Sequence, residues 1–414
     1  MQLTGVRAAG AALAVAALLA AGCGGDDDTS SDDEVSADEA AEVLGSENPA
    51  EGEPVKVGLI SDGPNQATDM QIELDVADAT VEYLNRHRGG IGGRPIDLVP
   101  CSTEADPGVA TDCANRMVEE DVVAVVIGSS AVMDTVWEPL HQAGLPTVLY
   151  ASSSAQIIQD TESSFVMSNS TAGIIDLPIA TAQEEGADKV TVVVIDVPAA
   201  LSIYDGIGAE AYEEAGLELD VVTVPPGTAD MSPQMQDIVS GDPGVIQVVG
   251  NDSFCISAFQ GLQAAGYDGP LTTIGQCITD ATLEAVPGEF LEGTLMSATA
   301  PVGIDSPDVD LYEAVIEAYG SDIDPSRITG WNMFIPLAGF GVAVADMEGE
   351  VTPETIVEAL RTMPEMELPG SGGLTFQCDG NAVPGQPAIC TRGLLGAVLN
   401  ADGEPAEYEI IGLD

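Results

Sequence analysis

Short apolar runs alternate with helical stretches along most of the chain. The clearest case begins with the run Val122–Ile127, which closes on Gly128 and two serines. It continues through a helical stretch at Met133–Ala143 into a second apolar run at Leu145–Tyr150. Runs of this length, bounded by turn residues and separated by a helix, are typical of buried parallel strands. The pattern predicts a doubly wound α/β sheet, in which ligands bind outside the carboxyl ends of the strands.

Small hydroxyl residues follow both of these apolar runs. Ser129 and Ser130 follow the first run, and Ala151, Ser152 and Ser153 follow the second. Serine hydroxyls and backbone N–H groups at a helix start can hold a carboxylate or another small polar group. One half of a binding site is therefore expected at these five residues. The alternative is that the serines only cap helices and form turns, and their spacing alone does not separate the two interpretations.

The same alternation continues before and after this stretch. Further strands are predicted at Val55–Ser61, Ile96–Pro100, Lys189–Asp196, Glu218–Val224, Gly244–Gly250, Leu271–Gly275 and Leu394–Leu399. Helices are predicted at Asp69–Arg86, Gly108–Glu120, Thr171–Glu185, Asp205–Ala215, Phe254–Ala265, Asp308–Gly320, Ile328–Met347 and Pro353–Met363. Right-handed crossovers between parallel strands place such helices on both faces of a sheet.

The chain before Val55 differs in composition from the rest. Arg7 precedes the apolar stretch Ala8–Ala21, which is too short to span a bilayer and matches the core of a secretory signal. Residues 1–22 are therefore expected to be a signal peptide. Residues 23–54 are rich in Asp, Glu, Ser and Ala with few large apolar residues. This composition predicts a solvated tether.

Acidic residues greatly outnumber basic residues. The chain has 69 Asp and Glu against 10 Lys and Arg, which gives a formal net charge of −59. This charge argues against nucleic acid or an anionic membrane surface as a direct partner. The lysine-poor composition, with only Lys56 and Lys189, suggests an acidic surface adapted to high salt. The alternative is an acidic composition that carries no salt requirement.

The residues that would indicate catalysis are scarce. The chain has two histidines, His87 and His141, and lacks the G-x-S-x-G, H-E-x-x-H and G-x-x-x-x-G-K-[ST] patterns. Paired carboxylates are not excluded in so acidic a chain, but nothing singles out two of them. The sequence gives no positive reason to expect an enzyme, a cofactor or a metal.

The order and spacing of several segments together resemble one protein family. The segments are VKVGLISDGP, YLNRHRGGIGGRPIDLVPCSTEADPGVATDCANRMV, VVIGSS, GLPTVLYASSS, VTVVVIDVPAALSIYDGIGAEAYEEAG, FQGLQAAGYDGPLTTIG and LTFQCDGNAVPG. They resemble a type I periplasmic binding protein of the branched-chain amino acid (Leu/Ile/Val-binding) type, the solute receptor of an ABC importer. The resemblance covers essentially all of Val55–Asp414.

The resemblance implies two doubly wound parallel-sheet lobes joined by a three-segment hinge. The N-terminal lobe is expected at residues 55–168 and 299–368, and the C-terminal lobe at residues 169–298 and 369–414. The expected crossings are Phe165–Ser168, Leu295–Pro301 and Pro369–Gly373, after which Leu374–Phe376 and Leu394–Leu399 complete the second lobe. Ligand between two such lobes closes the hinge.

The resemblance also implies roles for particular residues. Ser129, Ser130 and Ala151–Ser153 match the places that hold a ligand carboxylate. In the second lobe, Tyr204 is the nearest match to an aromatic contact, and Asp252 stands after the strand Gly244–Gly250.

The residue after the next strand departs from the family pattern. The family commonly places an acid there to pair with the ligand amine, but this chain has Gln276. If Asp252 supplies the charge, the ligand is a branched-chain or other amino acid. If it does not, an amide, a urea-like molecule or a carboxylic acid is expected. Asn65 and Gln66 lie in the first loop and could close over the ligand. Trp331 is included as a contact, with packing as its alternative.

Six cysteines remain once Cys23 is set aside, an even number in a chain expected to be exported into an oxidising compartment. Their connectivity has fifteen possibilities. Sequence separation favours the neighbouring pairs Cys101–Cys113, Cys255–Cys277 and Cys378–Cys390. The first pair also matches a loop that is bridged in related binders. A metal site is the alternative, but the chain has no C-x-x-C pair.

The end of the predicted signal peptide resembles a bacterial lipoprotein signal. Ala20-Ala21-Gly22-Cys23 carries the resemblance, with Ala20 where Leu is commonest. It implies a lipid on Cys23, which anchors the exported protein to the cell membrane, facing the periplasm or the exterior. An ordinary signal peptide is the alternative.

Together these observations predict a monomeric solute-binding lipoprotein that needs no cofactor. It would capture a small molecule by hinge closure and deliver it to an ABC permease. Two other functions stay open. One is a receptor of the same fold that signals instead of importing, and the other is an enzyme on a two-lobed α/β scaffold.

Overall fold

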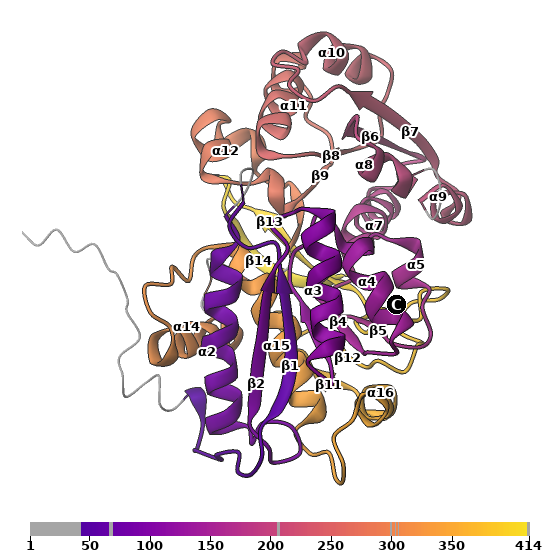
Figure 1. Cartoon of the computed structure of the whole chain (residues 1–414). Helices are drawn as coiled ribbons and strands as arrows, with labels where there is room; N and C mark the ends of the chain where they lie inside the picture. Colours follow the sequence, from indigo (N-terminus) through magenta and orange to yellow (C-terminus); the bar gives the residue numbers. More distant parts are fainter. Residues whose placement is uncertain are drawn as a thin grey trace, which may run out of the picture. The chain divides into compact units, whose positions relative to one another are not determined.

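The computed structural model describes residues 43–65, 69–204, 208–298, 300–302, 304 and 306–411 (Figure 1). The predicted signal peptide, Cys23 and most of the predicted tether lie outside these residues, as does Gln66.

The first sheet has five parallel strands in the order β2-β1-β3-β4-β5. Its strands are β1 (Val55–Ser61), β2 (Ile96–Ser102), β3 (Val125–Ile127), β4 (Thr147–Leu149) and β5 (Ser164–Val166). The strand residues alternate between two cores, as the pleat of a strand requires. Val57 and Leu59 pack in one core, whereas Ile60 packs in the other. The first predicted lobe is therefore a doubly wound parallel sheet, as expected.

Helices cover both faces of this sheet. They are α2 (Gln71–His87), α3 (Pro107–Glu119), α4 (Met133–Gln142), α5 (Ala155–Ile158), α14 (Pro307–Tyr319), α15 (Ile328–Val344) and α16 (Pro353–Thr362). The helices α2, α14, α15 and α16 supply one core, and α3, α4 and α5 supply the other.

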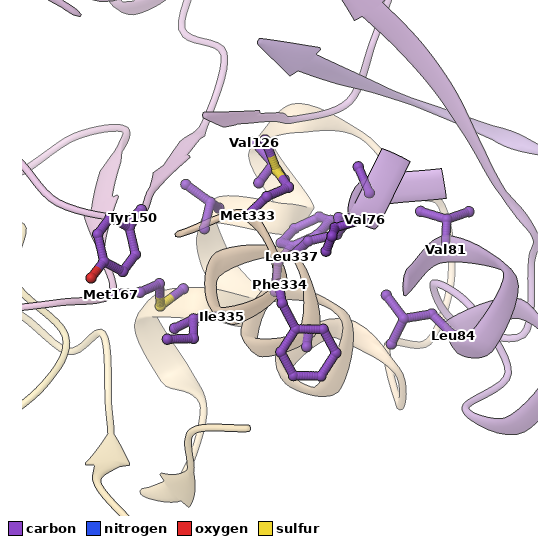
Figure 2. Packing of buried hydrophobic residues seen from close by; sticks show 14 of the residues in the cluster. Val76, Val81, Leu84, Val126, Tyr150, Met167, Met333, Phe334, Ile335 and Leu337 are labelled. Atoms are coloured by element: carbon purple, nitrogen blue, oxygen red, sulfur yellow. The ribbon is translucent and has the colours of Figure 1, made fainter. Parts of the chain in front are cut away.

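The helix α15 is mostly apolar, and most of its residues are buried in its core. Met333, Phe334 and Leu337 gather with Val76 and Leu84 of α2 (Figure 2). A Cβ atom on Gly341 would lie 2.6 Å from the Leu84 side chain, so the glycine permits this close approach of α15 to α2.

The second sheet has seven strands in the order β14-β13-β10-β9-β8-β6-β7. Its strands are β6 (Lys189–Ile195), β7 (Glu218–Val224), β8 (Val245–Val249), β9 (Leu271–Ile274), β10 (Leu295–Ala298), β13 (Leu394–Leu399) and β14 (Pro405–Ile411). The five strands from β10 to β7 are parallel, as predicted. The strand β13 runs antiparallel to both β10 and β14, so this edge of the sheet differs from the all-parallel prediction.

Short helices surround the second sheet. They are α6 (Ser170–Ile174), α7 (Asp176–Glu185), α8 (Pro198–Ile203), α9 (Ala209–Ala215), α10 (Ser232–Ser240), α11 (Asp252–Ala265), the 3₁₀ turn η2 (Gly275–Cys277), α12 (Asp280–Ala285) and α13 (Gly288–Leu291). Residues of α10 and α11 pack in one core of this sheet, and residues of α7 and α9 pack in the other.

The places where the chain passes between the sheets differ from the prediction. Phe165 pairs with Val148 of β4 and so belongs to β5. The first crossing, predicted at Phe165–Ser168, therefore begins after β5. Leu295–Ala298 forms β10 of the second sheet, so that crossing also begins later. Strands of three or four residues leave little signal in the sequence, so their local pattern is the same as that of a connection.

The assignment of Leu374–Phe376 to the second lobe is wrong. The strand β12 (Thr375–Phe376) pairs with β11 (Met366–Glu367) in a separate two-stranded sheet, and Phe376 packs in the core that contains α2 and α15. The Val166 N–H of β5 donates to the carbonyl of Ala388 at 2.7 Å, and Val166 forms a parallel bridge with Ile389. The segment that contains Ala388 and Ile389 therefore also joins the first sheet. The last passage to the second sheet lies between this segment and β13.

The glycine-rich stretch Pro369–Gly373 is therefore a hairpin loop between β11 and β12, instead of a crossing. It encloses the carboxylate of Asp308, which is in the first turn of α14. The backbone N–H groups of Gly370, Gly372 and Gly373 donate to this carboxylate at 2.7, 2.6 and 3.1 Å. All three glycines have positive φ, from +69° to +87°, which other residues rarely adopt.

Three disulfides join the cysteine pairs that sequence separation favours. Cys101 of β2 is bonded to Cys113 of α3, Cys255 of α11 to Cys277 of η2, and Cys378 to Cys390. The three predicted pairings are confirmed.

Each large sheet contains one lysine, and both lysines are paired. Lys56 of β1 lies 2.7 Å from the carboxylate of Glu120. Lys189 of β6 lies 3.1 Å from Asp220 and 3.7 Å from Glu218 of the neighbouring strand β7.

Candidate functional site

A buried carboxylate lies at the carboxyl ends of β1 and β3. Glu73, in the first turn of α2, is fully buried. It accepts hydrogen bonds from the Ser61 hydroxyl and from the Ser129 backbone N–H, the latter at 3.0 Å to Oε1 and 3.1 Å to Oε2. A Cβ atom on Gly128 would lie 2.7 Å from Glu73 Oε2, so a glycine is required beside it. Burial raises the pKa of Glu73, although the hydrogen bonds from Ser129 and Ser61 oppose that rise.

A second carboxylate, Asp62, accepts a hydrogen bond from the loop that follows β3. Asp62 directly follows β1 and is 5% exposed. It accepts from the Thr103 hydroxyl at 2.5 Å and from the Ala131 backbone N–H at 2.7 Å. Asn332 of α15 donates from Nδ2 to the Ser129 hydroxyl oxygen at 3.1 Å. The loop after β3 is thus fixed by groups from three separate parts of the chain.

The first-lobe residues predicted to bind ligand come together in two adjacent loops. Ile127 of β3 pairs with Leu149 of β4, so the loops that follow these strands are neighbours. Ser130 accepts from the Val132 N–H and Ser152 from the Ser154 N–H, each at 3.2 Å. These two hydroxyls therefore form turns, which is the alternative that the sequence left open. Ser153 is exposed, and Ala151 is half-buried.

The second-lobe residues divide between a core position and an exposed edge. Tyr204 is 3% exposed, and its hydroxyl donates to Gln247 Oε1 at 3.1 Å. Burial raises its pKa well above the ordinary value. Asp252 and Gln276 are both exposed, at the carboxyl ends of the neighbouring strands β8 and β9. The structure therefore places Asp252 and Gln276 at the same end of the second sheet, where β8 and β9 end. The Tyr204 hydroxyl is instead hydrogen-bonded inside the lobe.

The other two predicted ligand contacts that the structure describes, Asn65 and Trp331, differ in burial. Asn65 is half-buried in the loop after β1. Trp331 is 1% exposed, and its ring centroid lies 4.1 Å from that of Tyr312. It packs in the core around α15, which is the alternative that the sequence left open for this residue.

Sequence reasoning missed Glu73, Asp62 and Asn332. Glu73 carried a usable signal, because it lies between Ile72 and Val76 on the buried and mostly apolar face of α2. A carboxylate on such a face requires hydrogen-bond partners. The partners themselves come from distant segments, and no local pattern points to them.

One group resembles a catalytic triad in composition but differs from it in geometry. His141 Nδ1 lies 3.1 Å from the Ser163 hydroxyl and 3.6 Å from the Asp160 carboxylate. A triad uses one ring nitrogen for the serine and the other for the acid. Here both groups face the same nitrogen, and Ser163 is 2% exposed, so this trio does not form a proton relay to a substrate.

Among the helices that the structure describes, none has both the length and the apolar character needed to cross a membrane.

Comparison with known families gives a match over most of the chain. The profile of the family described as periplasmic binding protein matches residues 54–390. A Brucella suis protein named Leu/Ile/Val-binding protein homolog 6 is 27% identical over 267 residues. That match covers 61% of this chain and 66% of the Brucella protein, just under two-thirds of its length.

Solved structures with low sequence identity share the fold. An ABC transporter substrate-binding protein from Sphaerobacter thermophilus has a TM-score of 0.68 and 20% identity, covering 87% of this chain and 97% of its own. LivJ from Streptococcus pneumoniae in complex with isoleucine has a TM-score of 0.64 and 15% identity, covering 87% and 100%. A fatty acid ABC transporter substrate-binding protein from Thermomonospora curvata has a TM-score of 0.63 and 16% identity, covering 88% and 93%.

Proposed function

Because the chain belongs to the periplasmic binding protein family, we propose that it captures a small polar ligand outside the cytoplasm and delivers it to an ABC importer. One observation carries this proposal. Polar loops follow neighbouring parallel strands in both sheets, after β3 and β4 in the first and after β8 and β9 in the second. The carboxyl ends of parallel strands are where open α/β sheets bind ligands.

The exposed groups define the ligand class that we propose. Asp252 offers a carboxylate and Gln276 an amide on the second lobe, whereas Ser153 offers a hydroxyl on the first. A ligand with an amine or an amide N–H would match the carboxylate, and a polar oxygen would match the hydroxyl. We therefore propose a branched-chain or other amino acid, or an amide or urea-like compound. The name of the Brucella relative and the isoleucine in the Streptococcus pneumoniae complex support the first of these.

Hinge closure is the proposed mechanism. The chain passes between the two large sheets three times, and few-residue connections of this kind absorb the backbone rotation when lobes close. Ligand held by both lobes would favour the closed form, because only that form makes all of its contacts. An ABC permease would then receive the closed form.

We further propose that the protein is exported as a monomeric lipoprotein anchored through Cys23. The segment between Cys23 and β1 would act as the tether to the membrane, facing the periplasm or the exterior. The lipoprotein-like sequence Ala20-Ala21-Gly22-Cys23 supports this anchoring.

A thermal-shift screen of the full chain in molar KCl tests the binding function. The panel contains L-leucine, L-isoleucine, L-valine, acetamide, urea and octanoate. A ligand at ~1,000 times its Kd stabilises the folded state by about 4 kcal/mol, which raises the Tm by several degrees. A rise with an amino acid that is lost in D252A and kept in D268A supports the amino acid form of the proposal. Asp268 is a suitable control because it is an exposed acid at the opposite end of β9. A folded protein that no compound in the panel stabilises contradicts the proposed ligand class.

A further inference from the structure

The two exposed second-lobe groups, Asp252 and Gln276, lie beyond the part of the sheet that backbone pairing holds. The β8–β9 ladder joins Ile246–Val248 to Leu271–Thr273 and ends there. Within the described part of the chain, no backbone hydrogen bond links the turn after β8 to the turn after β9. Strand pairing alone therefore leaves the spacing between these two turns unfixed.

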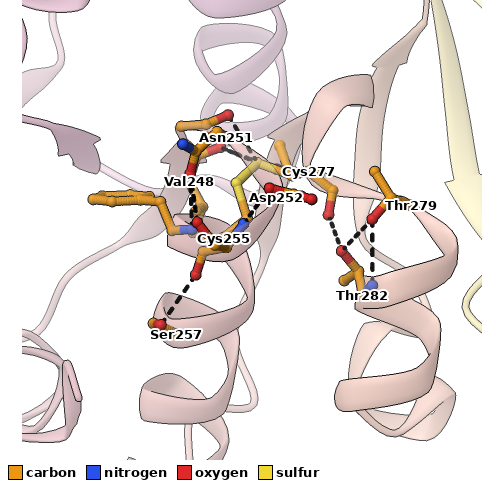
Figure 3. Close-up of a disulfide and its surroundings, with 12 residues drawn as sticks. Val248, Asn251, Asp252, Cys255, Ser257, Cys277, Thr279 and Thr282 are labelled. Atoms are coloured by element: carbon orange, nitrogen blue, oxygen red, sulfur yellow. Dashed lines mark hydrogen bonds between the residues drawn. A yellow bond between two sulfur atoms is a disulfide. The ribbon is translucent and has the colours of Figure 1, made fainter. Parts of the chain in front are cut away.

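A disulfide joins the two turns at this point (Figure 3). Cys255 lies in the first turn of α11, three residues after Asp252, and Cys277 directly follows Gln276. Both cysteines are fully buried. The Cys277 sulfur lies 3.7 Å from the Val248 carbonyl oxygen and 4.0 Å from that of Gly250. A bridged sulfur has no hydrogen to donate, so these are packing contacts that seat the bridge against the end of β8.

Each turn is also held together internally. In the first turn, Asn251 Oδ1 accepts from the Phe254 N–H at 3.0 Å and from the Ser253 hydroxyl at 3.1 Å. In the second, the Thr282 hydroxyl donates to the Cys277 carbonyl at 2.7 Å. The bridge adds a covalent link between two internally bonded turns whose side chains Phe254 and Ile278 also pack in one core.

We propose that the Cys255–Cys277 disulfide positions Asp252 and Gln276, so that the second-lobe half of the ligand site is formed before ligand arrives. This inference rests on the proposed function. A site that is already ordered loses less conformational entropy on binding. The bridge is thus a positioning element for a ligand that bears an amine or amide donor, and it does not itself touch the ligand.

Hydrogen exchange of the full chain tests the positioning without any ligand. The variant C255A/C277A is compared with the wild type and with C101A/C113A, which removes a bridge from the first lobe. The informative amides are those bonded within the two turns, namely Phe254, Cys255 or its replacement, and Ile278. We expect them to exchange at least tenfold faster in C255A/C277A and at the wild-type rate in C101A/C113A. The amides of β8 serve as an internal reference for global unfolding.

Unchanged exchange at these amides in C255A/C277A would overturn the proposal. Faster exchange in the control variant as well would also overturn it, since the effect would then be general. If C255A/C277A does not fold, C255V/C277A fills more of the buried space and replaces it in the same comparison.

Titration with L-isoleucine then separates this inference from the proposed function. If the wild type binds, the Kd is expected to rise at least tenfold in C255A/C277A and to stay unchanged in C101A/C113A, at a temperature where all three are folded. An unchanged Kd in C255A/C277A refutes the role in binding. If the wild type does not bind L-isoleucine, the amino acid form of the proposed function fails, while the exchange rates still decide the positioning.

Discussion

Glu73 accepts a hydrogen bond from the backbone N–H of Ser129 at 3.0 Å, across 56 residues of sequence. This bond turns the Ser129 backbone donor toward the interior. A ligand at the carboxyl end of β3 therefore meets the side chains of this loop and not that N–H group. The bond also anchors the loop to α2, so removal of the carboxylate has a predictable cost.

The variant E73A is expected to lower the free energy of unfolding by about 2–4 kcal/mol. It leaves the Ser61 hydroxyl and the Ser129 N–H without their shared acceptor in a buried place, and unpaired buried groups cost about 1–3 kcal/mol each. E73Q keeps one acceptor oxygen and should lose clearly less. Urea unfolding of the three proteins measures the difference. Equal losses in E73A and E73Q would show that the hydrogen bonds do not carry the effect.

The same carboxyl gives a pH dependence of defined sign. Burial raises the pKa of Glu73 above its ordinary value of 4.5, so the folded state binds this proton more tightly than the unfolded state. Its contribution to stability is therefore complete below pH 4.5 and is lost as the pH rises through the raised pKa. The stability of the wild type relative to E73Q should fall as the pH rises above 4.5. Urea unfolding across this range measures it, with E358Q, which removes an exposed carboxyl, as the control for the loss of one charge. A relative stability that rises with pH contradicts the assignment.

Replacement of Asp308 should loosen the glycine loop between β11 and β12. In D308N, the carboxylate that accepts from Gly370, Gly372 and Gly373 becomes an amide with a single acceptor oxygen. We expect a loss of about 2–4 kcal/mol in the free energy of unfolding, because hydrogen bonds to a charged group contribute about 1.5–3 kcal/mol each. D310N removes an exposed acid from the same first turn of α14 and should cost less than about 0.5 kcal/mol. Similar losses in both variants would assign the effect to the helix dipole.

Salt should stabilise the protein over a wide range. The net charge of −59 creates self-repulsion that added ions screen, and the Debye length falls from about 30 Å at 0.01 M to about 3 Å at 1 M. We expect the Tm to rise steadily from dilute buffer to molar KCl. A protein that is more stable in dilute buffer than in molar KCl would refute adaptation to high salt. A Tm that does not change would favour the acidic composition without a salt requirement.

The larger elements of the fold could be predicted from the sequence, because each leaves a long local pattern. The runs at Val55–Ser61 and Lys189–Ile195 are mostly apolar, and both form interior strands that pair on each side. The disulfides also followed from sequence, since each joins cysteines close together in the chain. The strand pairs of two residues could not be predicted from the sequence. A two-residue strand such as β12 is fixed by what packs against it and has no pattern of its own.

The candidate site was less predictable for a related reason. The sequence places serines at the right ends of the strands, but a hydroxyl can bind ligand or form a turn with the same local spacing. Ser130 and Ser152 form turns because the N–H groups of Val132 and Ser154 are within reach. The role of Ser129 depends on Glu73 and Asn332, which belong to other helices. Such a role becomes visible only when distant segments are brought together.

The placement of the two lysines has a practical consequence. Lys56 lies in β1 and Lys189 in β6, so each large sheet holds a single side-chain amine, and the sequence has no other lysine. Besides the N-terminus of the chain, these are the only sites for an amine-reactive dye. A donor and an acceptor fluorophore attached there would report the separation of the two sheets by energy transfer. This distance measurement requires no engineered cysteine, and it leaves all three disulfides intact.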